Sequence, residues 1–62
     1  MLRRYVREYA NDKRNIYVQI AKESPRLLDD CAARIARIDQ VVKAYERYEI
    51  IADDAIRAIL EA

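Results

Sequence analysis

The chain has 62 residues and a net charge of +1, with no Gly, no His and a single Cys. A chain of this length seldom buries enough apolar surface to be stable through its core alone, so disulfides, a metal ion or oligomerisation usually support it. A single Cys excludes an internal disulfide, and one Cys without any His provides too few ligands for a zinc ion. We therefore expect no cofactor, and we expect oligomerisation to support the fold.

The first predicted element is a helix over residues 2–23. Without Gly the chain has no residue that freely adopts positive φ, so tight hairpins between strands are disfavoured and an all-α fold is expected. A polar stretch at residues 11–15 interrupts the apolar pattern, but the apolar residues on either side stay in phase, which favours one continuous helix. The apolar stripe consists of Leu2, Val6, Tyr9, Ile16 and Ile20.

A break is predicted at Ser24-Pro25. Ser24 can accept hydrogen bonds from backbone N–H groups in the first turn of a following helix, and Pro25 suits the first helical position because it has no N–H to leave unpaired. The residue before a proline disfavours helical dihedral angles, so the first helix should end near residue 23. We expect the two helices to form a hairpin within a single helical domain, residues 1–62.

The second predicted element is one long helix over residues 25–61. A seven-residue repeat places apolar side chains at nine of its ten seam positions, which is typical of a helix that packs against another helix. Glu49 is the exception, and we expect the two isoleucines that follow it to shift the apolar stripe and turn Glu49 toward water. The seam consists of Leu28, Cys31, Ile35, Ile38, Val42, Tyr45, Glu49, Ala52, Ile56 and Ile59.

The second helix is too long for the first to cover. The two would span about 33 Å and about 55 Å, so a hairpin leaves the residues beyond roughly Tyr48 without a neighbour. This apolar overhang predicts a dimer that completes the core, either as a four-helix bundle with antiparallel long helices or as a parallel coiled coil. A third option is a bend near Ala52-Asp53, with Asp53 capping a short final helix that folds back within the monomer. The predicted dimer or partner interface consists of Leu28, Ile35, Ile38, Val42, Tyr45, Ala52, Ile56 and Ile59.

Positive charge is concentrated in residues 1–26, which carry a net charge of +4, whereas residues 27–62 carry −3. Arginines interleaved with tyrosines on one helix could bind phosphates and stack on bases, so nucleic-acid binding is the alternative function. An overall charge near zero favours protein partners over nucleic acid. The possible nucleic-acid contacts are Arg3, Arg4, Tyr5, Arg7, Lys13 and Arg14.

No catalytic template fits the sequence. There is no Gly-rich phosphate loop, no Ser-His-Asp set and no EF-hand spacing, and no His could act as a base beside Cys31. Cys31 is expected to be a small buried apolar residue. Glu46, Glu49 and Asp53 form a line at helical spacing, but the His that accompanies Glu in bundle metal sites is missing, so a solvated acidic face is expected.

No segment resembles a signal peptide or a transmembrane helix, so we expect a cytoplasmic location and no membrane partner. The sequence therefore predicts a small non-enzymatic protein–protein interaction module. We expect it to act as a homodimeric regulator or adaptor, with another helical protein as the other candidate partner.

Overall fold

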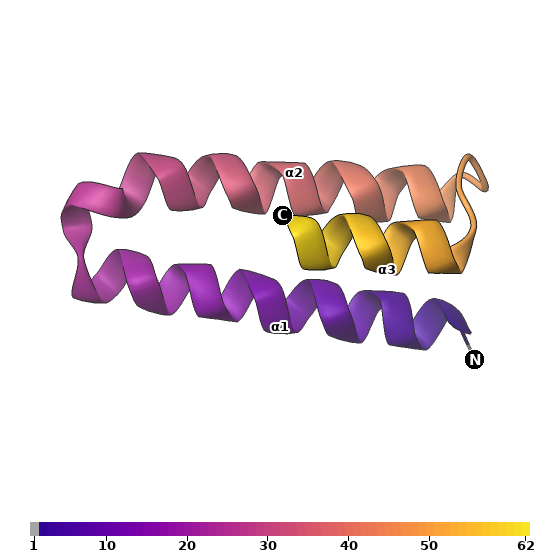
Figure 1. Cartoon of the computed structure of the whole chain (residues 1–62), viewed down its shortest axis with the longest axis horizontal. Coiled ribbons are helices and arrows are strands. Elements are labelled where there is room, and N and C mark those ends of the chain that lie inside the picture. Colours follow the sequence, from indigo (N-terminus) through magenta and orange to yellow (C-terminus); the bar gives the residue numbers. More distant parts are fainter. Residues whose placement is uncertain (1) are drawn as a thin grey trace.

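The computed structural model describes the backbone of residues 2–62 and the side chains of residues 5–62. The prediction of an all-α fold is confirmed, and α1 has the bounds predicted for the first helix. α2 runs antiparallel to α1, and α3 folds back alongside both of them (Figure 1). The elements of the described residues are α1 (Leu2–Glu23), the short 3-10 helix η1 (Pro25–Leu27), α2 (Leu28–Glu46) and α3 (Ala52–Glu61).

The connection between α1 and α2 is built from main-chain hydrogen bonds. The Ser24 N–H donates to the carbonyl oxygen of Ile20 at 2.8 Å, and the Leu27 N–H donates to the carbonyl oxygen of Ser24 at 2.8 Å. Pro25 takes the first position of η1, where its missing N–H leaves no donor unpaired. The side chain of Ser24 forms no capping hydrogen bond, so the expected side-chain cap is not made.

The predicted single helix over residues 25–61 is wrong. The chain leaves α2 after Glu46, turns through residues 47–51 and enters α3 at Ala52. This arrangement corresponds to the third option from the sequence, with the turn placed earlier than Ala52-Asp53. The residue before α3 is Ile51 in an extended conformation, and no side chain caps the helix there, so Asp53 is not the cap.

The turn after α2 uses a tyrosine where helices commonly end on glycine. Tyr48 has φ of 63°, in the left-handed region. The Tyr48 N–H donates to the carbonyl oxygen of Tyr45 at 3.0 Å, and the Glu49 N–H donates to that of Ala44 at 2.9 Å, a pairing that terminates many helices. A left-handed non-glycine residue costs about 1–2 kcal/mol.

Burial of α3 outweighs that cost. Ala55 and Ile59 are fully buried, and burying one isoleucine side chain contributes about 1.5–3 kcal/mol. A straight helix would leave both side chains in water unless another molecule covered them. The fold back of α3 therefore covers part of the apolar overhang within the monomer, while Ile51 and Leu60 remain exposed.

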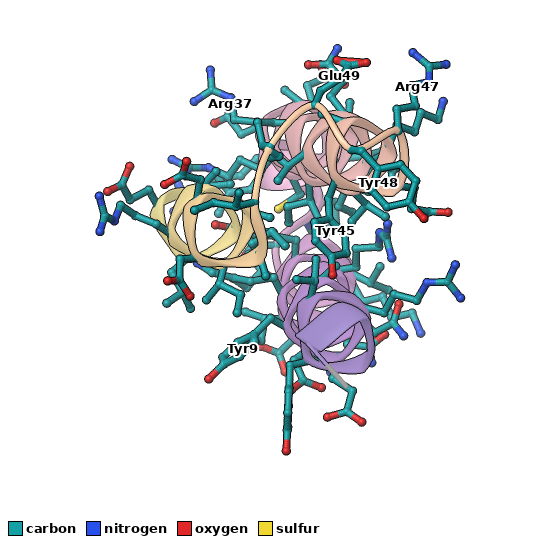
Figure 2. The ribbon with its side chains drawn as sticks, turned by 90° about the vertical axis from the view of Figure 1, so that its right-hand side faces the viewer. Tyr9, Arg37, Tyr45, Arg47, Tyr48 and Glu49 are labelled. Carbon is teal, nitrogen blue, oxygen red and sulfur yellow. The ribbon has the colours of Figure 1, made fainter. Side chains whose placement is uncertain are left out.

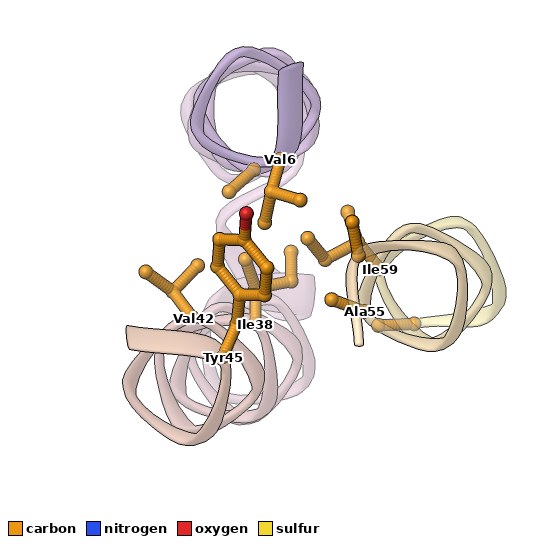
Figure 3. Close-up of a cluster of buried hydrophobic side chains, with 9 residues drawn as sticks. Val6, Ile38, Val42, Tyr45, Ala55 and Ile59 are labelled. Atoms are coloured by element: carbon orange, nitrogen blue, oxygen red, sulfur yellow. The ribbon is translucent and has the colours of Figure 1, made fainter. Parts of the chain in front are cut away.

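The core lies where the three helices meet (Figure 3). Tyr45 reaches from α2 toward α1, beside Val6, while Ile59 approaches from α3 (Figure 3). Alanines at the inner face of α3 allow its backbone to come close to the other two helices. The buried cluster consists of Val6, Ala10, Ile38, Val42, Tyr45, Ala52, Ala55, Ile59 and Ala62.

The end of α3 is held by two side chains from the hairpin. The Tyr17 hydroxyl donates to the carbonyl oxygen of Ala62 at 2.6 Å, and Arg34 Nη1 donates to the same oxygen at 2.7 Å. A guanidinium at this position is also favourable because the C-terminal end of a helix carries partial negative charge. α3 stops there, so the part of the hairpin near Ser24 is not covered by it (Figure 1).

Candidate interaction surface

The structure divides the predicted interface between core and surface. Ile38, Val42, Tyr45, Ala52 and Ile59 are buried in the chain's own core, so they offer no surface while α3 is docked. The assignment of these residues to an interface assumed one straight helix, and that assumption is the part the structure overturns. Ile56 is half-buried and packs against the core.

Leu28 and Ile35 are the predicted interface residues that line an open surface. They border a shallow groove of about 260 Å³ between α1 and α2. Leu28 is 57 % exposed, and Val18, on the α1 wall of the groove, is 42 % exposed. We call this surface the apolar groove; it is lined by Val18, Ala21, Lys22, Leu28, Cys31, Ala32 and Ile35.

The apolar groove opens away from α3. Tyr17 and Arg34 bind the end of α3, whereas Val18 and Ile35, the next residue along each helix, line the groove. Successive helical residues are turned by about 100°, so these two pairs of side chains leave the hairpin in different directions. α3 lies to one side of the α1–α2 pair when the molecule is viewed from its end (Figure 2).

Two ion pairs continue the same face beyond the groove. Arg14 Nε lies 2.7 Å from Asp39 Oδ1, and Arg7 Nη2 lies 3.3 Å from Glu46 Oε2. Arg7 and Arg14 are seven residues apart on α1, and Asp39 and Glu46 are seven apart on α2, so each helix repeats its charge after two turns. We call these four residues the charged ladder; its α1 edge is basic and its α2 edge is acidic.

The candidate nucleic-acid contacts whose side chains the structure describes are not gathered on one face. Tyr5 and Arg7 are two residues apart on α1, which separates them by about 200° around the helix. Arg7 and Arg14 pair with carboxylates, and Lys13 Nζ lies 5.4 Å from the centre of the Tyr17 ring. The side chains of Arg3 and Arg4 lie outside the described residues. Nucleic-acid contact through this helix stays a prediction.

Other exposed apolar side chains lie elsewhere on the molecule. Tyr9 projects beneath α3 in Figure 2, and Tyr48 in the turn after α2 is 80 % exposed. Leu60 on the outer side of α3 is 53 % exposed. A second groove of about 280 Å³ extends past the end of α3, but Asp30 and Arg34 contribute to its lining, so it is less apolar than the first.

Sequence reasoning found only part of the apolar groove. It identified Leu28, Cys31 and Ile35 through the seven-residue repeat, but it missed Val18 and Ala21 on α1. These two lie three residues apart, beside the main apolar stripe of α1 rather than on it. Their helical spacing is the signal that could have revealed them.

No protein-family model matches the chain, and neither curated proteins nor solved structures provide a match. Within the described residues, no helix is long and apolar enough to cross a membrane, and no three potential ligands among His, Cys, Asp and Glu converge on a metal position. The apolar groove and the charged ladder are therefore the features on which a functional assignment can be built.

Proposed function

We propose that the chain is a small non-enzymatic protein–protein interaction module, a homodimeric regulator or adaptor, that associates with a second copy through the apolar groove. The observation that carries this proposal is the exposure of Leu28 and Val18 on opposite walls of that groove. Fully burying a large aliphatic side chain contributes about 1.5–3 kcal/mol, and these two side chains keep about half of their surface exposed, so a complementary surface that covers them gains about half of that value from each.

The chain exposes more surface than a folded monomer of its mass usually does, and this excess supports a partner that covers part of it. The folded chain exposes 4777 Å², whereas a folded monomer of 7.3 kDa exposes about 4,200 Å². The difference, roughly 600 Å², is at the lower end of the range of about 600–1,000 Å² that each partner buries in a specific protein–protein interface. When no other protein is present, a second copy of the chain is the partner that can cover this area.

Sedimentation equilibrium of the wild-type chain and two variants tests the proposal. At rising micromolar concentration the wild-type chain should approach twice the monomer mass of 7.3 kDa. Leu28→Glu places a charge in the apolar groove and should remain monomeric, because burying an unpaired charge is strongly unfavourable. Leu60→Glu is the matched control, because Leu60 is similarly exposed but lies on α3, outside the groove, so this variant should dimerise like the wild type.

Circular dichroism must show equal helicity for the three proteins before their masses are compared. A wild-type chain that stays monomeric up to millimolar concentration contradicts the proposal. So does a Leu28→Glu variant that dimerises as tightly as the wild type.

Nucleic-acid binding is the second candidate, and the exposure of Tyr5 and Tyr9 favours it, because both rings are accessible for stacking on bases. It predicts binding to single-stranded RNA or DNA that weakens steeply with salt. Replacing Arg3, Arg4 and Arg7 by Ala should reduce the dependence of log K on log salt, since each phosphate contact contributes to that slope. Absence of binding at low salt eliminates this candidate.

A further inference from the structure

We infer that the second copy packs about a two-fold axis parallel to the helices, so that the basic edge of α1 in one copy lies on the acidic edge of α2 in the other. This inference rests on the proposed self-association and specifies its geometry. It is carried by the charged ladder and by the sizes of the side chains that line the apolar groove.

The charged ladder has the pattern needed for a self-complementary surface. α1 contributes Arg7 and Arg14 to this face, and α2 contributes Asp39 and Glu46. The carboxylate side chains remain 47 % and 43 % exposed, and a carboxylate accepts hydrogen bonds at several positions. Each can therefore also be approached by an arginine from a second molecule.

The order of the apolar groove and the charged ladder along the helices decides between a parallel and a perpendicular two-fold axis. A two-fold axis parallel to the helices keeps every residue at its own level, so groove meets groove and ladder meets ladder. A perpendicular axis reverses the direction of the helices in the second copy. If this axis passes through the apolar groove, the two charged ladders do not meet. If it passes through the centre of the whole face, each charged ladder lies over the apolar groove of the other copy. Only the parallel axis brings the two ladders into contact without placing charged side chains against exposed apolar ones.

The parallel axis also sets the two walls of the apolar groove against each other. It places α1 of one copy against α2 of the other at matched levels, so Val18 lies opposite Ile35, and Ala21 lies opposite Ala32, between Ile35 and Leu28. Alternation of small and large residues across facing positions is what allows two helical layers to interdigitate. A perpendicular axis would instead pair α1 with α1 and α2 with α2.

The resulting assembly is a four-helix bundle formed by two hairpins packed face to face, in which neighbouring helices are antiparallel and α3 of each copy stays on the outside. At the level of Arg14 and Asp39, basic and acidic groups alternate around the axis. The molecule measures 35 × 17 × 15 Å, so one broad face offers roughly 600 Å² per copy, near the lower limit for a specific dimer.

A charge-exchange experiment tests the axis. The acidic variant carries Arg7→Glu and Arg14→Glu, and the basic variant carries Asp39→Lys and Glu46→Lys. Each variant alone should lose self-affinity by about tenfold or more, because like charges would face each other across the axis. An equimolar mixture should form a heterodimer, detected by native mass spectrometry, and added salt should weaken it because exposed charges are screened.

Two controls make the outcomes separable. A variant with Arg47→Glu and Arg57→Glu has the same net charge as the acidic variant but changes arginines outside the charged ladder, so it should still form homodimers. If the double variants lose helicity, the single substitutions Arg14→Glu and Asp39→Lys repeat the test with one pair.

A wild-type dimer that requires Leu28, combined with no heterodimer in the mixture, overturns the axis and leaves the proposed self-association intact. A homodimer of the acidic variant as tight as the wild type overturns the axis as well. Absence of any wild-type dimer removes both proposals together.

Discussion

The Tyr17 hydroxyl donates a hydrogen bond of 2.6 Å to the carbonyl oxygen of Ala62, which joins the middle of α1 to the end of α3. These residues are 45 positions apart in the chain, so the bond forms only when α3 has folded back. It therefore reports on the docked position of the last helix.

Removing this hydroxyl should destabilise the docked α3. Tyr17→Phe should lower the free energy of unfolding by about 0.5–1.5 kcal/mol, the usual net contribution of such a hydrogen bond. Urea unfolding followed by circular dichroism measures the change. Tyr5→Phe is the control, since Tyr5 is 51 % exposed, and it should leave stability nearly unchanged. Equal stability of the two variants would contradict the docked arrangement.

The left-handed Tyr48 should be a position where substitution stabilises the protein. Tyr48→Gly should raise the free energy of unfolding by about 0.5–1 kcal/mol, because glycine adopts positive φ without the steric cost, although part of the gain is lost to the greater entropy of the unfolded chain. Tyr48→Val should lower it, because a β-branched residue tolerates this conformation poorly. Thermal unfolding of both variants gives the comparison, and the reverse order of stability would contradict the turn.

Ile59 should be among the most sensitive positions in the chain. It is fully buried, so Ile59→Ala should cost about 2–5 kcal/mol through lost burial and a residual cavity. Leu60→Ala, at the neighbouring exposed position, should cost less than about 1 kcal/mol. Chemical denaturation at a concentration where the chain is monomeric checks this. A small effect of Ile59→Ala under those conditions would mean that α3 does not pack within its own chain.

The sequence was sufficient to predict α1 and its end. Its apolar spacing predicted the helix, and the proline after Ser24 predicted where it stops, because both signals are local. The turn after α2 has no such local signal. Tyr48 occupies a position that usually takes glycine, and it is held there by the burial of Ala55 and Ile59, which lie further along the chain.

The seven-residue repeat indicated that the helix packs against another helix, but the part of it in α3 packs within its own chain rather than against a second copy. Ala52, Ile56 and Ile59 keep the spacing of the repeat, yet they pack against their own α1 and α2. Apolar periodicity specifies which face of a helix is covered and does not specify which chain covers it. Leu28 and Ile35 were found because they belong to the seven-residue repeat, whereas Val18, on the other wall of the groove, lies beside the main apolar stripe of α1 and was missed.

Isotope-filtered NMR on an equal mixture of labelled and unlabelled chains tests the central claim most directly, because it detects only contacts between molecules. The self-associated module should give intermolecular contacts from the methyl groups of Val18 to those of Leu28 or Ile35. Absence of intermolecular contacts at millimolar concentration, or contacts confined to side chains outside the apolar groove such as Leu60, would contradict the claim.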